Sequence, residues 1–264
     1  METNKKNKRI IIGNIKMNIL TKIDRDRYIN ELSEESNGVD FEKVNVIICP
    51  PSIHLESFSK NLAGENAQVG AQNIHWESRG PYTGEISSEM IKDFGIKYSI
   101  VGHSERRQYF GETNEMVNLK IKSLLKNEIS PIFCFGETRE ERGMGASKDV
   151  VVSQIVEGLR DILDEDVTKI VFAYEPIWSI SDGISPAEVP TSDEVMEIKI
   201  LVKKTVAEKY GEDKASEISV LYGGSVNSKN IEQVCVDSGV DGVLVGGQSL
   251  VPANFMELAK ILGE

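Results

Sequence analysis

Three side chains in this sequence form a set that could move a proton beside a carbonyl group: Lys16, His103 and Glu175. Glu175 offers a carboxylate base, which can take a carbon-bound proton where water is excluded. His103 lies where a strand-like run gives way to a helix-like segment, and the positive potential at a helix N-terminus favours the neutral imidazole as a proton donor. Lys16 supplies a fixed positive charge for a developing oxyanion. The residue types therefore predict acid–base chemistry.

Each of these residues has a simpler explanation when it is taken alone. A glutamate before a proline at a strand end is more often a capping or salt-bridged residue. A single histidine is more often a hydrogen-bonded structural residue, and a single lysine is usually solvated. Their common placement favours the chemical interpretation, because each one follows a predicted strand.

Two glycine pairs predict an anion-binding site. Gly223 and Gly224, followed by Ser225, come after the seventh predicted strand, and Gly246 and Gly247 come after the eighth. Glycine lets backbone N–H groups approach an anion closely, and a short helix predicted after Gly247 would direct its dipole at the anion. One pair would more simply serve a tight turn, but two pairs at adjacent strand ends favour a phosphate site.

The elements that must position these residues alternate between strand and helix. Asn114–Lys126 and Ser192–Tyr210 carry apolar residues at helical spacing, with charges between them. Short runs rich in β-branched residues are mostly apolar without strict alternation, which is typical of strands buried on both faces. The predicted strands are Ile10–Gly13, Val44–Cys49, Gln68–Ala71, Tyr98–Gly102, Pro131–Phe135, Ile170–Tyr174, Ile218–Tyr222 and Gly242–Val245.

This alternation predicts an α/β fold, a single (β/α)8 barrel with eight parallel strands and outer helices, rather than an open doubly wound sheet. No GxGxxG motif follows the first strand, which argues against dinucleotide binding. A length of 264 residues suits one barrel domain. We expect residues 10–264 to form it and residues 1–9 to be a short polar tail. The chemistry of such barrels sits where the strands end, as Asn14 does here.

Composition excludes several other classes of protein. The net charge of −12 argues against a nucleic-acid partner. The apolar runs are too short to span a bilayer and no signal-peptide core follows the N-terminus, so we expect no membrane partner and a cytoplasmic location. The cysteines (Cys49, Cys134 and Cys235) are widely spaced, and His54 and His75 lack partners at metal-ligand spacing. We therefore expect neither a disulfide framework nor a metal site.

Five stretches, in this order and at these intervals, resemble the signature sequences of the triosephosphate isomerase family. The resemblance covers nearly the whole chain. It implies an isomerase of glycolysis and gluconeogenesis that interconverts dihydroxyacetone phosphate and D-glyceraldehyde 3-phosphate through an enediolate, without a cofactor. The stretches are Gly13–Asn18, Gly102–Arg107, Tyr174–Trp178, Tyr222–Val226 and Asp241–Gly247.

The resemblance also implies a role for each matching residue. Lys16, His103 and Glu175 are catalytic: stabilising charge, electrophile and base. The substrate-binding residues are Asn14, Lys16, Ser181, Ser225, Gly246 and Gly247, and the supporting residues are Glu105, which pairs with the lysine, Cys134, which packs behind Glu175, and Gly224.

The chain departs from the family pattern at several places. Ile15 replaces a tryptophan, Gln248 stands where a small residue usually follows the glycine pair, and Ser179–Ile184 replaces the usual lid sequence Ala-Ile-Gly-Thr-Gly-Lys. The altered lid leaves open a paralogous isomerase of a four-carbon ketose phosphate, such as an erythrulose phosphate. A non-catalytic phosphosugar-binding barrel is a further alternative.

The polar segment Asn73–Ser88 is longer than an ordinary connection between elements. Loops of this length are typical of functional segments, so we expect either a lid or a segment that a partner buries. The resemblance implies that it inserts into a second subunit of a homodimer, with Thr83 reaching the partner's active site near Asn14. The alternative is a loop folded over its own barrel.

Overall fold

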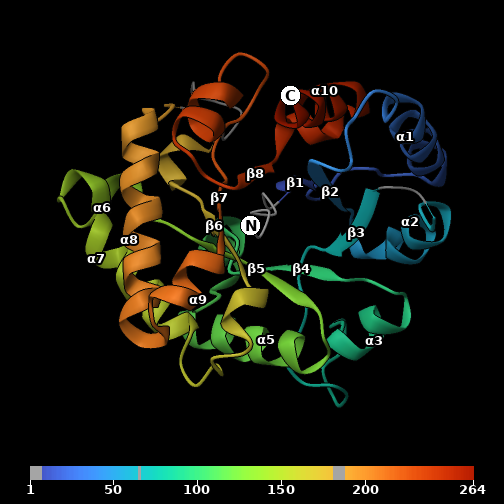
Figure 1. Cartoon of the computed structure of the whole chain (residues 1–264). Helices are drawn as coiled ribbons and strands as arrows, with labels where there is room; N and C mark the ends of the chain where they lie inside the picture. The colour runs from blue at the N-terminus through green and yellow to red at the C-terminus, as the bar shows by residue number, and fades with distance from the viewer. Residues whose placement is uncertain (1–7, 65–66, 181–187) are drawn as a thin grey trace, which may run out of the picture.

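The computed structural model describes residues 8–64, 67–180 and 188–264. Its parallel strands form one closed barrel in chain order (Figure 1), because β1 pairs with both β2 and β8. This confirms the predicted (β/α)8 architecture. The strands are β1 (Arg9–Asn14), β2 (Val44–Cys49), β3 (Ala67–Ala71), β4 (Tyr98–Val101), β5 (Ser130–Phe135), β6 (Val171–Tyr174), β7 (Ser219–Tyr222) and β8 (Gly242–Val245).

The strand boundaries differ from the prediction by at most one residue at either end, and one difference has a clear cause. β4 ends at Val101 because Gly102 adopts a positive φ of 73° and leaves the strand. Its N–H then donates to Glu112 Oε1 at 2.7 Å rather than to a neighbouring strand. This turn is what directs the next residue, His103, out of the barrel wall.

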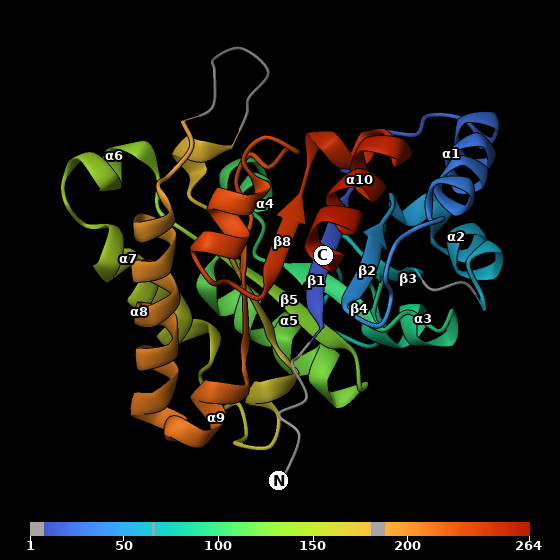
Figure 2. The same cartoon turned by 45° about the horizontal axis from the view of Figure 1, so that its top comes forward.

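The helices lie around the barrel, with α1, α2 and α10 on one side and α6, α7 and α8 on the opposite side (Figure 2). The two helices expected from the sequence are found at the predicted bounds, as α5 and α8. The helices are α1 (Lys22–Glu35), α2 (Leu55–Asn61), α3 (Ser88–Asp93), α4 (Ser104–Phe110), α5 (Asn114–Lys126), α6 (Arg139–Gly143), α7 (Ser147–Gly158), α8 (Ser192–Tyr210), α9 (Glu212–Glu217) and α10 (Pro252–Gly263).

Shorter turns complete the path of the chain. The helix predicted after the second glycine pair is a 3₁₀ turn, Gly247–Leu250, which precedes α10. Another 3₁₀ turn, Ile177–Ser179, follows β6, and a π-helical stretch, Glu232–Asp237, follows β7. In the part of the chain that the structure describes, no helix is both long and apolar enough to cross a membrane.

Two apolar layers fix the strands in place. Alternate strand residues point into the barrel, where Ile12, Ile47, Ile132 and Leu244 belong to one buried cluster. The intervening residues, such as Phe133, face the helices in a second and larger cluster. Because both faces of each strand are buried, the strand ends are held rigidly, and side chains that follow them share one well-defined rim.

Candidate active site

A pocket of about 640 Å³ opens at the ends of the strands. Most of the residues that the sequence predicts for the site line it, although they come from distant parts of the chain. Of the predicted residues, the pocket is lined by Asn14, Lys16, His103, Glu175, Gly224, Ser225, Gly246 and Gly247. Ser181 lies outside the described residues, so the structure gives no position for it.

His103 and Glu175 face one another in this pocket. The distance from His103 Nε2 to Glu175 Oε1 is 3.3 Å, and both residues are buried, at 6% and 2% exposure. The second carboxylate oxygen, Oε2, accepts the backbone N–H of Ser104 at 3.2 Å. The backbone N–H of Glu175 donates to Phe135 on β5 at 2.7 Å. Glu175 is therefore held at its backbone by β5 and at its carboxylate by the start of α4 and by His103.

His103 caps the N-terminus of α4, as the sequence predicts. Its Nδ1 accepts the backbone N–H of Glu105 at 3.2 Å. A nitrogen that accepts a hydrogen bond carries no proton, so this cap assigns the neutral tautomer in which Nε2 bears the hydrogen. That N–H points toward Glu175 and the pocket, where it can donate to an oxygen of a bound molecule.

Lys16 occupies an unusual backbone conformation. Its φ of 55° lies in the left-handed region, which costs a non-glycine residue roughly 1–2 kcal/mol. Asn14 Oδ1 accepts the Lys16 N–H at 3.0 Å, and Gln72 Nε2 donates to the Lys16 carbonyl at 2.9 Å. Nζ forms an ion pair with Glu105 Oε1 at 2.7 Å, which is the pairing that the resemblance implied. The strained backbone is thus fixed on both sides.

Gln72 is a site residue that the sequence reasoning missed. It follows β3, and its amide also donates to the Cys49 carbonyl at 2.8 Å, so it ties the ends of β1, β2 and β3 together. Its position directly after a predicted strand, on the same rim as the other polar residues, is the signal that could have identified it.

Close packing requires the glycines of the first turn, Gly223 and Gly224. A side chain at Gly224 would collide with the Tyr222 hydroxyl, and a Cβ at Gly223 would lie 2.7 Å from Glu175 Cγ. A Cβ at Gly246 would lie 3.3 Å from Lys16 Cε. The first turn therefore leaves room for Glu175, whereas at the second turn the flexible Lys16 side chain could move and a Cβ at Gly247 would meet nothing within 4 Å. The Ser225 N–H donates to the Ser179 carbonyl at 3.0 Å, so this turn also holds the chain that follows β6.

A buried ionic cluster supports the turn before His103. Glu112 accepts hydrogen bonds from the Gly102 N–H, from Arg106 Nε at 2.6 Å and from Lys120 Nζ at 2.5 Å. Burial alone would raise the pKa of Glu112, but Lys120 and the hydrogen bonds outweigh it and lower that pKa. Lys120 also donates to Asn73 Oδ1 at 2.7 Å. The cluster links α4 and α5 to the start of the 73–88 segment, and the sequence reasoning did not identify it.

Cys134 lies inside the barrel and does not line the pocket, although its thiol neighbours the Glu175 carboxylate. Burial raises the pKa of its thiol well above the usual value, with the Glu175 charge as the next cause. A buried, protonated thiol is a packing residue rather than a nucleophile. Among the residues that the structure describes, no group of histidine, cysteine and acidic side chains could hold a metal ion.

The 73–88 segment packs on its own chain at its two ends and is exposed at its tip. His75 stacks between Trp76 and Tyr82, with ring centroids 4.1 and 4.4 Å away. Residues 77–85, including Thr83, are exposed, so the tip of the segment projects into solvent. An exposed tip is what a segment buried by a partner subunit would show in the single chain.

Two of the departures from the family pattern fall on described residues. Ile15 is fully buried, and its N–H donates to the Cys49 carbonyl at 3.2 Å, so it acts as a packing residue. Gln248 lines the pocket, and its Oε1 accepts from Asn254 Nδ2 at 3.0 Å, which holds the side chain toward α10. The altered lid sequence falls mostly on residues 181–187, outside the described part of the chain.

Comparison with known proteins places this site in a family. The family model described as triosephosphate isomerase matches residues 9–262. The chain is 42% identical over 253 residues to the triosephosphate isomerase of Dictyoglomus turgidum, covering 96% of this chain and 99% of the relative. It is 42% identical over 251 residues to that of Thermoanaerobacter pseudethanolicus (95% and 98% covered), and 40% identical over 251 residues to that of Lactobacillus delbrueckii subsp. bulgaricus (95% and 97%). This chain belongs to the triosephosphate isomerase family.

Proposed function

We propose that this chain interconverts dihydroxyacetone phosphate and D-glyceraldehyde 3-phosphate, with Glu175 as the base, His103 as the neutral electrophile and Lys16 as the stabilising charge. The observation that carries the proposal is the 3.3 Å approach of His103 Nε2 to Glu175 Oε1 inside a pocket that also contains Lys16 and two glycine turns. Membership of the triosephosphate isomerase family supports the same reaction.

The proposed reaction moves one proton between adjacent carbons. The Glu175 carboxylate takes a proton from the carbon beside the carbonyl, and the electrons of the broken C–H bond form the C=C bond of an enediolate. Charge develops on the carbonyl oxygen, where the His103 Nε2–H donates a hydrogen bond. Return of the proton to the former carbonyl carbon, together with transfer of the hydroxyl proton of the other carbon to the former carbonyl oxygen through His103 Nε2, gives the isomer and restores Glu175 and His103. Both carboxylate oxygens already contact His103 and Ser104, so Glu175 must exchange a contact for the substrate.

Local charge explains how an acidic protein can bind an anionic substrate. The chain carries a net charge of −12, but Lys16 lies in the pocket wall next to Gly246. The substrate-binding roles of Asn14, Ser181, Ser225, Gly246 and Gly247 belong to this proposal. Of these, the described residues all line the same pocket, and backbone N–H groups at glycine turns attract anions whatever the overall charge.

We further propose that the chain is a homodimer in which the 73–88 segment of each copy enters the other, with Thr83 beside Asn14. The exposed tip of the segment supports this, as do large exposed apolar side chains on the same rim. Met17, directly after Lys16, is 89% exposed. Tyr109 and Phe110, at the end of α4, are also exposed. A second copy covering these residues would complete the wall of the pocket. Two further expectations remain predictions: that residues 10–264 form a single domain, and that the protein is cytoplasmic.

The purified chain should be assayed with dihydroxyacetone phosphate in a coupled assay, with erythrulose 4-phosphate as the competing substrate. We expect turnover of the three-carbon substrate, with proton exchange at its C1 in deuterium oxide detected by NMR. Preference for the four-carbon substrate would favour the paralogous isomerase. Absence of both exchange and turnover would favour the remaining alternative, a non-catalytic barrel that binds a phosphosugar.

A further inference from the structure

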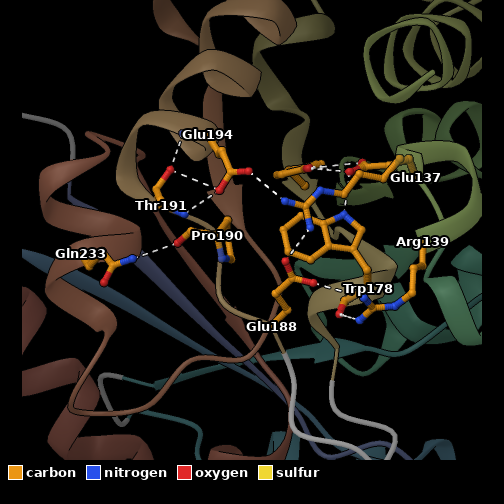
Figure 3. Close-up of polar contacts among 10 residues, drawn as sticks. Glu137, Arg139, Trp178, Glu188, Pro190, Thr191, Glu194 and Gln233 are labelled. Carbon is orange, nitrogen blue, oxygen red and sulfur yellow. Dashed lines mark hydrogen bonds and ion pairs between the residues drawn. The ribbon is translucent and has the colours of Figure 1, made fainter. Parts of the chain in front are cut away.

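Two arginines of α6, Arg139 and Arg142, contact the chain on both sides of residues 181–187. Figure 3 shows Arg139 beside Trp178 and Glu188. The Arg142 guanidinium carbon lies 3.6 Å from the centre of the Trp178 ring, so the planar group stacks on the indole. Arg142 Nη1 donates to Glu188 Oε1 at 3.0 Å. Trp178 belongs to the 3₁₀ turn before these residues, and Glu188 follows them directly. A single side chain thus joins the two flanks.

A second arginine of the same helix repeats this pattern. Arg139 Nη2 donates to the Trp178 carbonyl at 3.2 Å, and Nη1 donates to Glu188 Oε2 at 3.1 Å. Both carboxylate oxygens of Glu188 are therefore occupied by α6. A capping box formed by Thr138 and Glu141 fixes the start of this helix. We call Arg139, Arg142, Trp178 and Glu188 the α6 bracket.

The bracket is anchored to α8 as well. Arg142 Nη2 donates to Glu194 Oε1 at 2.9 Å. The other oxygen of Glu194 accepts the Thr191 N–H at 2.8 Å in the capping box that begins α8. The Pro190 carbonyl accepts from Gln233 at 2.9 Å. The chain after Glu188 consequently enters α8 along a path with several fixed points.

The opposite end of the bracket leads directly to the pocket. The Trp178 indole N–H donates to the buried Glu137 carboxylate at 2.8 Å, which also accepts the Tyr174 hydroxyl. The next residue, Ser179, accepts the Ser225 N–H and contacts the Tyr222 hydroxyl at 2.7 Å. Ile180 then lines the pocket itself. A shift of Trp178 would be transmitted within two residues to the pocket wall and to the glycine turn.

We propose that Arg142 is a positioning residue for the reaction at this site. By holding Trp178 and Glu188 together it sets where Ser179 and Ile180 enter the pocket wall, although it touches no substrate. This inference rests on the proposed isomerase function. Exposed ion pairs are individually weak, but stacking and two pairs converge on one guanidinium, whose planar fork a lysine cannot reproduce.

The test combines an optical and a kinetic measurement on the full chain. Trp76→Phe removes the other tryptophan, so Trp178 becomes the sole indole and this variant is the parent for quenching. The chain that retains Trp76 is the parent for kcat, because Trp76 lies in the segment proposed to enter the partner. Arg142→Ala, Arg142→Lys and Glu188→Gln are compared with the matching parent. Lys148→Ala is the matched control, because it removes a 3.3 Å ion pair to Glu197 of α8 outside the bracket.

We expect Arg142→Ala to increase acrylamide quenching of Trp178 and to lower kcat on the order of 10- to 100-fold, the scale of a small misplacement of positioning groups. KM should change less than kcat. Arg142→Lys should recover only part of the loss, Glu188→Gln should show a smaller loss, and Lys148→Ala should match the parent in both measurements.

The outcomes separate this inference from the proposed function. If the chain that retains Trp76 has no isomerase activity, the function is refuted and the inference falls with it, whereas the quenching data still report whether Arg142 holds Trp178. With an active parent, the inference is overturned if Arg142→Ala leaves either quenching or kcat within twofold of the parent. If Arg142→Ala does not fold, the same criterion applies to Arg142→Lys and Glu188→Gln, which preserve most of the packing.

Discussion

The reaction centre and the α6 bracket hold their side chains in different ways. His103 and Glu175 are buried and fixed by backbone N–H groups of Glu105 and Ser104. The bracket is built from side chains, and the Glu188 carboxylate is 48% exposed. Buried, backbone-held groups keep their geometry in most solutions, whereas half-exposed ion pairs respond to salt and pH. The reaction centre and the α6 bracket should therefore lose their geometry under different solution conditions.

The largest effect should come from the reaction centre. Glu175→Gln keeps the size of the side chain but removes the proton acceptor, so kcat should fall by at least ~10³-fold, the usual contribution of acid–base catalysis. Binding of a phosphate-bearing inhibitor should change little, as measured by its inhibition constant in residual activity or by calorimetry. Retention of more than a tenth of normal turnover would rule out the proposed base.

The second prediction tests whether the reaction centre depends on another copy of the chain. Thr83→Arg puts a charge at the exposed tip of the 73–88 segment, and burying it unpaired in a partner costs several kcal/mol. Monomerisation and loss of activity should occur together, although Thr83 performs no chemistry, while Thr83→Ser should remain dimeric. Sedimentation and activity measured across protein concentration test this, and a fully active monomer would refute it.

The third prediction concerns the buried cluster behind His103. Glu112→Gln leaves Lys120 and Arg106 without their carboxylate, and breaking a buried pair costs about 3 kcal/mol in the free energy of unfolding. Urea unfolding at neutral pH measures the loss, and Glu115→Gln on exposed α5 surface serves as a control. A change below 0.5 kcal/mol, the ordinary scatter of surface substitutions, would contradict it.

The same cluster gives a pH dependence with a definite sign. The pKa of Glu112 is lowered in the folded state. Its stabilising contribution is therefore fully present above the unfolded carboxyl pKa, roughly 4.3, and is lost as pH falls through the lower folded value. The difference in unfolding free energy between the parent and Glu112→Gln should shrink below about pH 4. A difference that grows on acidification would reverse this assignment.

The smallest effect should come from Arg139, the bracket arginine that does not stack on Trp178. Arg139 is 67% exposed and does not stack on Trp178, so Arg139→Ala should lower kcat by less than about threefold, as expected for an exposed ion pair. Raising salt to about 1 M should erase the difference from the parent, since the Debye length is then about 3 Å. A loss equal to that of Arg142→Ala would remove the distinction between the two arginines.

The sequence predicts what depends on local pattern and chain order. Apolar runs located the strands, strand ends located Lys16, His103 and Glu175, and apolar residues at helical spacing located α5 and α8. The end of β4 was misplaced by one residue because the positive φ of Gly102 depends on its distant partner, Glu112.

Side-chain partnerships between remote elements could not be predicted in the same way. Gln72 contacts Lys16, which is far away in the chain, and Arg142 meets both Trp178 and Glu188 only after α6 and β6 have packed. Arginines in a charged helix are most often solvated, so the sequence of α6 does not indicate that one of its arginines stacks on an indole ring. The proposed lid residues and Ser181 lie outside the described part of the chain.

The left-handed backbone of Lys16 places stability and activity in direct conflict. Glycine adopts this conformation without the steric cost that lysine bears, roughly 1–2 kcal/mol. A screen that selects variants only for resistance to heat would therefore tend to enrich Lys16→Gly, and with it lose the positive charge of the pocket. Given the proposed role of Lys16, evolution of this chain must be selected on turnover as well, because a variant with a more relaxed backbone at this position would lack the charge assigned to catalysis.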